Sequence, residues 1–104
     1  MIRKPIQFHH EATTDYETAL HWYFERNEVA AFRFWEEINK AIEKISAAPH
    51  RWAKHIQGTH RLLLHRFPYA VVYRELPECI QIVAVAHLSR RPGYWTSRMQ
   101  NNID

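Results

Sequence analysis

The segment from Ile80 to Leu88 constrains the fold most strongly, because apolar residues occupy both its odd and its even positions. A half-exposed strand alternates apolar and polar residues, whereas a strand covered on both faces does not. The segment is therefore predicted to be a central, doubly covered strand. The turn sequences Phe67-Pro68 and Pro77-Glu78 flank the preceding strand. Their short connections predict three consecutive antiparallel strands, at about residues 60–67, 69–76 and 79–88.

The first part of the chain is predicted to form a short strand and a helix. Residues 4–9 alternate apolar and polar side chains, which favours a strand. In the helix that follows, Thr14 and Glu17 are a candidate capping box near the start, and the alternative is a helix that starts slightly earlier. Asn27 tolerates the left-handed conformation and is expected to end the helix. The apolar face of this helix consists of Ala12, Tyr16, Ala19, Leu20 and Tyr23.

A second helix is predicted at about residues 29–47. It ends before Pro49, because proline lacks a backbone donor and disfavours helix in the residue before it. The short break between the two helices implies a helical hairpin. Residues 50–59 are expected to be a loop, and a short helix or tail begins at Pro92. The apolar stripe of the second helix consists of Ala31, Phe34, Trp35, Ile38, Ala41, Ile42 and Ile45.

These elements describe one α+β domain over residues 1–104, in the order β-α-α-β-β-β with a possible C-terminal helix. No apolar run approaches the roughly 18 residues that span a membrane, and no apolar signal segment follows the basic N-terminus. We therefore expect no membrane partner. The single cysteine, Cys79, cannot form an internal disulfide, which fits a reducing cytoplasm.

Charge is divided unevenly along the chain. Residues 1–49 carry six Lys/Arg and eight Asp/Glu, a net charge of −2. Residues 50–104 carry eight Lys/Arg and three Asp/Glu, a net charge of +5. No carboxylate occurs between Lys44 and Arg74, nor between Cys79 and Ile103. A basic half of this kind predicts a polyanion or an acidic protein as the partner.

The histidines do not predict a metal site. His50, His55, His60 and His65 recur every five residues, which matches neither one face of a helix nor one face of a strand. The chain has no His-Glu-x-x-His motif and no Cys/His cluster. Its two glycines cannot build a glycine-rich phosphate loop. We therefore expect neither a metal nor a cofactor.

His87 is a candidate proton-transfer group. It follows the apolar strand and precedes Ser89-Arg90-Arg91, which places it at the end of the strand beside positive charge. Neighbouring cations favour the neutral imidazole, which can act as a general base near pH 7. The alternative is a histidine that hydrogen-bonds to the backbone at the strand terminus.

Arginines are the candidate anion-binding residues. Arg61, Arg66 and Arg74 flank Phe67-Pro68-Tyr69, and this half of the chain has few carboxylates to pair with them. Arginine clamps on phosphate are a recurring way of stabilising phosphoryl transfer. The tail combines cations and aromatic rings at Arg90, Arg91, Tyr94, Trp95 and Arg98. This pattern suits base stacking with phosphate contact, and for the two rings the alternative is packing onto the core.

The element order and several motifs resemble the RelE/ParE superfamily, the toxins of type II toxin–antitoxin modules that are often described as plasmid-stabilisation proteins. The motifs are Asp15-Tyr16, Arg61 followed by Phe67-Pro68-Tyr69, and His87 followed by Arg91-Pro92-Gly93-Tyr94-Trp95. The resemblance covers about residues 3–98. It implies a small α+β fold, in which the helical hairpin packs on a twisted antiparallel sheet.

The resemblance also implies partners. One is a cognate antitoxin, whose disordered acidic segment wraps the toxin and folds on binding. The toxin reaches operator DNA through the antitoxin complex. ParE-like members inhibit DNA gyrase, whereas RelE-like members cleave mRNA in the ribosomal A site. A third alternative is an attenuated homologue that binds only its antitoxin and operator.

The site residues match the two branches differently. For a RelE-like nuclease, the expected catalytic residues are Arg61, Arg74, His87 and Tyr94. In either branch, the residues expected to contact the target or nucleic acid are Lys54, Arg90, Arg91, Trp95 and Arg98. Lys54 is the only lysine after Lys44, and Leu88 lies near the place where a nuclease would carry a catalytic arginine. We therefore favour ParE-like gyrase inhibition.

Overall fold

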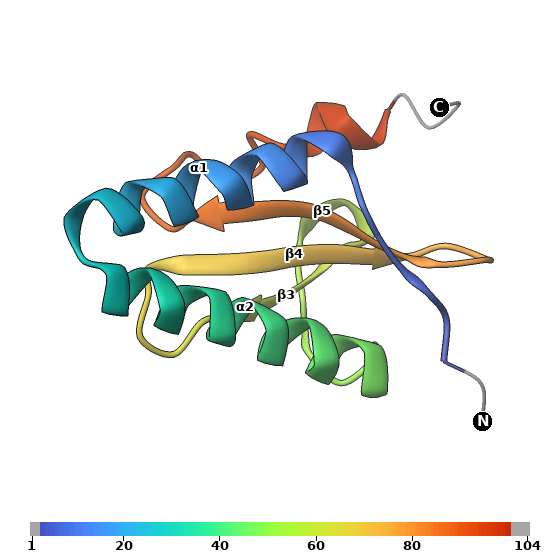
Figure 1. Cartoon of the computed structure of the whole chain (residues 1–104). Coiled ribbons are helices and arrows are strands. Elements are labelled where there is room, and N and C mark those ends of the chain that lie inside the picture. Colours follow the sequence, from blue (N-terminus) through green and yellow to red (C-terminus); the bar gives the residue numbers. More distant parts are fainter. Residues whose placement is uncertain (1–2, 101–104) are drawn as a thin grey trace.

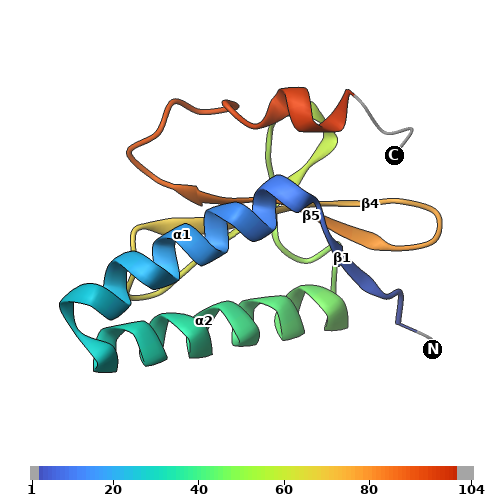
Figure 2. The same cartoon turned by 45° about the horizontal axis from the view of Figure 1, so that its top comes forward.

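Two helices pack on one face of a five-stranded sheet (Figure 1). The computed structural model describes residues 3–100. Figure 2 shows the two helices as one layer and the strands as a second. In chain order the elements are β1 (Ile6–Phe8), α1 (His10–Arg26), α2 (Glu28–Ala47), β2 (Ala53–Lys54), the 3-10 turn η1 (Ile56–Gly58), β3 (His60–Leu63), β4 (Tyr69–Glu75), β5 (Ile80–His87) and the 3-10 turn η2 (Thr96–Met99).

The α+β fold class is confirmed, but the sheet is mixed rather than antiparallel. Its strand order is β1-β5-β4-β3-β2, and β1 runs parallel to β5, with Ile6 opposite Ile80. The other neighbours are antiparallel. A parallel pair needs a long crossover, which the intervening helices and strands supply. The segment 50–59, predicted as a loop, contains β2 and η1, because Ala53 and Lys54 pair with β3.

β5 is covered on both faces, as its sequence predicts. On the helix side, Ile82 and Val85 belong to the main core with Phe34 of α2. On the opposite side, Ala84 packs in a second buried cluster with Trp95 from the C-terminal segment. The two clusters explain why both parities of this strand are apolar.

α1 begins at His10, so the predicted capping box of Thr14 and Glu17 is wrong. The N-cap is His9, whose Nδ1 accepts a hydrogen bond from the backbone N–H of Glu11 at 3.0 Å. Thr14 lies inside the helix, where its hydroxyl donates to the carbonyl of His10 at 3.3 Å. An imidazole nitrogen thus fills the role that Ser, Thr, Asp or Asn usually fills.

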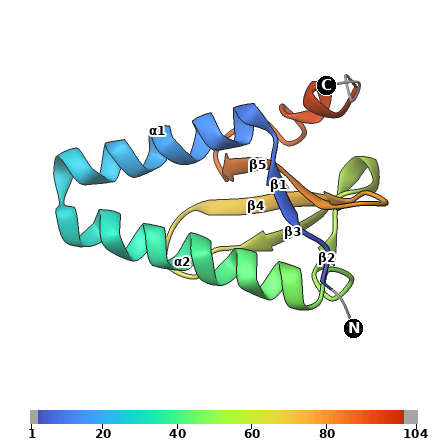
Figure 3. The ribbon, with the colours of Figure 1, turned by 45° about the vertical axis from the view of Figure 1, so that its right-hand side comes forward.

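Asn27 joins the helices by capping the second one, so the predicted left-handed C-cap is wrong. Its backbone is extended, with φ −165°. Its side-chain oxygen accepts from the N–H groups of Val29 at 2.9 Å and Ala30 at 3.3 Å. Asn is among the best N-cap residues, and this preference outweighs its tolerance of the left-handed region. The result is a tight antiparallel hairpin (Figure 3).

One residue of the predicted α2 stripe faces outward. Trp35 is 46% exposed and stacks on Phe32 at 5.8 Å between ring centroids. The fully buried members of the stripe are Ala31, Phe34, Ile38, Ala41 and Ile45.

Strands cover each outer edge of the sheet only in part. β1 pairs with β5 from Ile80 to Ile82 and leaves the rest of β5 without a neighbouring strand on that side. β2 pairs with β3 at His60 and Arg61 only. Beyond these short strands, backbone N–H and C=O groups face outward and need other partners.

Candidate functional site

Six of the nine predicted site residues line one shallow hollow at the C-terminal end of β5. They are Arg61, His87, Arg90, Arg91, Tyr94 and Trp95. We call this the basic hollow, and its remaining lining residues are His55, Ala70, Val72, Ala86, Leu88 and Pro92. Its volume of about 60 Å³ is far below the roughly 300–1,000 Å³ of pockets that enclose a small molecule. A ligand of this surface would therefore lie across it rather than inside it.

The C-terminal segment is fixed beside the hollow by Trp95 and Gly93. Trp95 is only 2% exposed and packs against Val72, Val83 and Ala84, so it is an anchor rather than a free stacking platform. Gly93 has φ +80°, and a Cβ there would come within 2.8 Å of the Ile56 side chain. The positive φ favours glycine at this position, and a larger residue would be strained there and would push the end of the Ile56 side chain aside.

Tyr94 lies between two arginines. The guanidinium of Arg90 sits 4.0 Å from its ring centroid and that of Arg98 sits 5.4 Å away. Burial, followed by the nearby Asp15 carboxylate, raises the pKa of Tyr94. The phenol therefore stays protonated at neutral pH and can donate a hydrogen bond, but it is a poor base.

His87 is held by its neighbours at the end of β5. Its Nδ1 accepts from the backbone N–H of Ser89 at 3.0 Å and lies 2.8 Å from the Ser89 hydroxyl. Its ring also meets Tyr69 edge to face, at 4.9 Å between centroids. A backbone N–H can only donate, so Nδ1 is the acceptor and the neutral ring carries its proton on Nε2. This geometry matches the alternative of a histidine bonded to the backbone at a strand terminus.

Three predicted residues lie outside the basic hollow. Arg74 donates from Nε to the side-chain oxygen of Gln81 on β5 at 2.8 Å, a cross-strand pair. Lys54 is exposed on β2. Arg98 belongs to η2 and points away from the hollow, toward α1.

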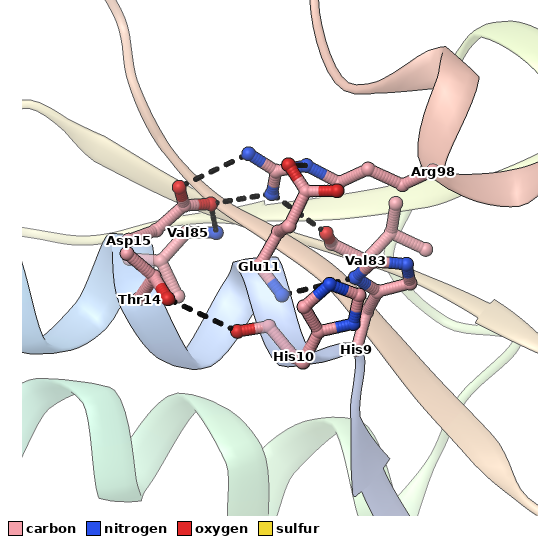
Figure 4. A network of polar contacts seen from close by, with 8 residues as sticks. All are labelled: His9, His10, Glu11, Thr14, Asp15, Val83, Val85 and Arg98. Atoms are coloured by element: carbon pink, nitrogen blue, oxygen red, sulfur yellow. Dashed lines mark hydrogen bonds and ion pairs between the residues drawn. The ribbon is translucent and has the colours of Figure 1, made fainter.

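Arg98 forms an internal ion pair with Asp15, which sequence reasoning missed (Figure 4). The two side chains form a fork, with Nη1 to Oδ2 at 2.7 Å and Nη2 to Oδ1 at 3.1 Å. Nη1 also donates to the carbonyl of Val83 at 3.0 Å, and Oδ2 accepts from the N–H of Val85 at 3.1 Å. Burial opposes the charge of Arg98, but the hydrogen bonds and charge of Asp15 outweigh it and raise the pKa of Arg98.

The Asp15–Arg98 pair supplies hydrogen-bond partners to the part of β5 that β1 does not cover. The N–H of Val85 and the C=O of Val83 lie beyond the reach of β1 and would otherwise face outward. Both side chains are largely withdrawn from solvent, with 11% exposure for Arg98 and 15% for Asp15. We name this arrangement the Asp15–Arg98 clamp.

His55 is a lining residue that the sequence analysis set aside among scattered histidines. It packs 5.8 Å from the Trp95 ring. Burial, followed by the charge of Arg61, lowers the pKa of His55. His55 is therefore a neutral hydrogen-bonding group on a surface whose charged side chains are arginines. No sequence signal separated His55 from the other histidines, because its partner Trp95 lies far away in the chain.

Among the residues that the structure describes, the donor cluster closest to a metal site is His9, His10 and Glu11, whose ligand atoms lie within 4.8 Å of one another. It is a poor cation site. His9 Nδ1 already accepts the N-cap hydrogen bond, and Arg98 lies 3.7 Å from Glu11. The positive end of the α1 dipole also points here. None of the helices in residues 3–100 has the length and apolar character of a membrane span.

The comparisons with known proteins agree with this fold. The sequence matches the family described as "ParE toxin of type II toxin-antitoxin system, parDE" over residues 6–92. No curated protein matches the chain. Among solved structures it is similar to one described as "Chromosomal ParDE TA system from P. aeruginosa", with a TM-score of 0.72 and 17% sequence identity over 83% of this chain and 97% of that chain. At that identity, the likeness shows the fold alone. Because the family match spans most of its length, the chain belongs to the ParE toxin family of type II toxin–antitoxin systems.

Proposed function

We propose that this chain inhibits growth in the cytoplasm by binding DNA gyrase, and that a cognate antitoxin neutralises it. In complex with the antitoxin it reaches operator DNA. The observation that carries the proposal is the basic hollow, a shallow surface on which the exposed cations Arg90 and Arg91 lie beside Arg61. A surface of this kind suits binding to a partner better than chemistry on it.

The residues named for a nuclease support this distinction. Arg74 is bonded to Gln81 outside the hollow. The Nδ1 of His87 is occupied by Ser89, and Tyr94 is a phenol with a raised pKa. A general acid–base mechanism needs a base within hydrogen-bond reach of its substrate. Among the residues named for a nuclease, His87 has one ring nitrogen engaged and Tyr94 is a protonated phenol, whereas Arg90 and Arg91 are exposed cations at the hollow.

A supercoiling assay with purified DNA gyrase tests the proposal. The wild-type chain should inhibit supercoiling and stabilise cleaved DNA, whereas Arg90→Glu with Arg91→Glu should lose at least about tenfold in potency, because both charges would oppose the partner. Arg51→Glu is the matched control, since Arg51 is exposed and lies outside the hollow. A wild-type chain that leaves gyrase unaffected would rule the proposal out.

Ribosome-dependent mRNA cleavage is the second candidate, because Arg61, His87 and Tyr94 do line the same hollow. Toeprinting on translating ribosomes would then show cuts in the A site that disappear in His87→Ala and Arg61→Ala. Intact mRNA beside active wild-type toxin would reject this candidate. A chain that is harmless in both assays but binds its antitoxin would be an attenuated homologue.

A further inference from the structure

A second concavity lies where α1 passes the start of β4 and the end of β5. Its volume of about 350 Å³ falls within the roughly 300–1,000 Å³ of pockets that enclose a small molecule or a ring. We call it the aromatic pocket, because α1 lines it with Trp22 and Tyr23 and the strands line it with Tyr69 and His87. His87 also lines the basic hollow, so the two concavities meet at the end of β5.

The aromatic pocket and the basic hollow belong to opposite faces of the sheet. Tyr69 and His87 line the pocket, whereas their chain neighbours Ala70 and Ala86 line the hollow. Alternate residues of a strand point to opposite faces. A ligand that touches both concavities must therefore pass over the end of the sheet, which suits a chain molecule better than a compact one.

Aromatic rings form the walls of the pocket. The ring of Tyr23 meets Trp22 edge to face at 5.1 Å between centroids and lies 6.4 Å from Tyr69. Trp22 is 50% exposed, in contrast to Trp95, which is buried beside the hollow. The sequence pattern indicated a stacking surface in the C-terminal segment, but the exposed ring that could provide it lies on α1.

Arg26 holds Trp22 in place and adds charge. Its guanidinium lies 3.8 Å from the Trp22 ring centroid, and its Nη1 donates to the Trp22 carbonyl at 3.0 Å. Arg26 is not one of the residues that line the pocket, so it stacks on the ring outside the pocket and leaves the pocket side open. An open aromatic face beside a cation is the combination that binds the bases and phosphates of single-stranded nucleic acid.

His87 brings a hydrogen-bond donor to the place where the two concavities meet. Its Nδ1 is engaged by Ser89, so the neutral ring carries its proton on Nε2. Burial raises the pKa of Tyr23 and of Tyr69, so both phenols stay protonated and carry no negative charge. Donors of this kind match the acceptor atoms on the edge of an unpaired base.

The charges along this path have one sign. Among the residues that the structure describes, no Asp or Glu lines either concavity. Exposed cations lie at both ends, with Arg26 beside the pocket and with Arg90 and Arg91 on the hollow. Aromatic rings between cations correspond to the bases and phosphates of a nucleic acid strand, which a protein ligand would match only with an unusual side-chain sequence.

We propose that the aromatic pocket binds a base of single-stranded DNA, whose phosphates continue over the end of β5 to Arg90 and Arg91. The inference rests on the proposed function for the source of this DNA, because cleaved DNA held by gyrase would supply the unpaired bases. Stacking on Trp22 accepts any base, so binding should depend little on sequence. Duplex DNA fits poorly, because its bases are already stacked and paired.

Fluorescence anisotropy with a short, labelled oligothymidylate tests the pocket on the full-length toxin without gyrase. Trp22→Ala should weaken binding by about tenfold, because one stacked base is lost, and Trp22→Phe should lose less. Trp35→Ala is the matched control, since it removes another half-exposed tryptophan that lies outside the pocket. Trp22 is half exposed, so these variants should keep the wild-type circular dichroism spectrum. Equal binding by Trp22→Ala and wild type overturns the inference.

Salt dependence tests the phosphate path. For single strands, the logarithm of the affinity falls with the logarithm of the salt concentration by about 0.7 per phosphate contact. Arg90→Ala with Arg91→Ala should reduce this slope by about 1.4. Arg51→Ala should leave it unchanged, because Arg51 lies outside both concavities and stacks on Trp52 much as Arg26 stacks on Trp22. An unchanged slope in the double variant overturns the path.

Two competitors test the class of ligand. Unlabelled single-stranded DNA should displace the probe, whereas duplex DNA of the same length should do so at least about tenfold less well. A duplex that competes equally well overturns the inference. Single-stranded RNA that binds about tenfold more tightly than DNA also overturns it, because the site would then serve RNA.

The outcomes separate this inference from the proposed function. If the wild-type chain inhibits gyrase but binds no oligonucleotide, the DNA site alone fails. If it binds single-stranded DNA through Trp22 but leaves gyrase unaffected, the proposed function alone fails.

Discussion

The outward backbone groups at the two outer edges of the sheet are bonded by different side chains and to a different extent. At the β5 edge, the N–H of Val85 and the C=O of Val83 are bonded to the Asp15–Arg98 clamp, a buried pair from distant parts of the chain. At the β3 edge, Glu37 bonds only the N–H groups that follow the strand. The backbone groups of Leu63 are left facing a groove lined by cations.

The β5 edge is therefore closed by side chains beyond β1, whereas the β3 edge is closed only in part. Open strand edges invite pairing with other chains, and proteins usually block them. Here the blocked edge supports the C-terminal segment that borders the basic hollow, whereas the other edge leaves backbone groups of Leu63 without a neighbouring strand in the described part of the chain. The next three predictions challenge this comparison, beginning with the largest effect.

Removing the clamp should cost the most stability. Arg98→Met leaves the Asp15 carboxylate largely buried without its partner, and it frees the C=O of Val83. Loss of one member of a buried pair costs about 3 kcal/mol of unfolding free energy. Urea denaturation followed by fluorescence measures this change.

The double variant Asp15→Asn with Arg98→Met is the control for charge. It removes the stranded carboxylate, so it should recover part of the loss, because the two side chains act as one unit. If Arg98→Met alone is as stable as wild type, the β5 edge does not depend on its clamp, and the contrast between the edges disappears.

Removing the Glu37 carboxylate from the β3 edge should lower the unfolding free energy by less than removing the clamp. Glu37→Ala frees two N–H groups that lie on exposed backbone, where water can replace the carboxylate. The expected loss is about 1 kcal/mol in the same denaturation experiment, and Glu37→Gln, which keeps an acceptor oxygen, should lose less. A cost equal to that of Arg98→Met would show that both edges are structural.

The smallest effect concerns pH at the start of α1. Burial, followed by the charge of His10, lowers the pKa of the His9 N-cap. The folded state then holds fewer protons than the unfolded state below the ordinary histidine pKa of about 6.5, so stability is lost as the pH falls through that value. His9→Asn keeps a capping acceptor and should weaken the pH dependence of the melting temperature between about pH 7.5 and 5. An unchanged dependence would assign it to other groups, of which His55 is one.

Local sequence pattern was sufficient to predict the two helices and the three long strands. It did not predict the helix caps or the short strand β2. The two-sided apolar pattern of Ile80–Leu88 predicts a doubly covered strand, and the apolar stripe of the second helix predicts its buried face. The role of Asn27 was predicted wrongly, because its side chain can serve the end of one helix or the start of the next. The two residues of β2 are too few to leave a pattern of their own.

The sequence could predict which residues gather at the basic hollow, but not the bonds that they make. Arg61, His87 and Tyr94 were selected from sequence, and β-strand pairing brings them to one hollow. The bond between Arg98 and Asp15 joins the last turn to the first helix. No spacing rule connects positions so far apart, so Arg98 was interpreted as a free cation.

The parallel pairing of β1 with β5 has a consequence for the order in which the fold is completed during synthesis. Ile6 leaves the ribosome early, but its partner Ile80 follows only after most of the chain, and pairings distant in sequence form late. Arg98, which completes the clamp, is made later still. The first strand must therefore wait for its partner, so a partly synthesised chain lacks both the completed sheet and the fixed tail beside the basic hollow.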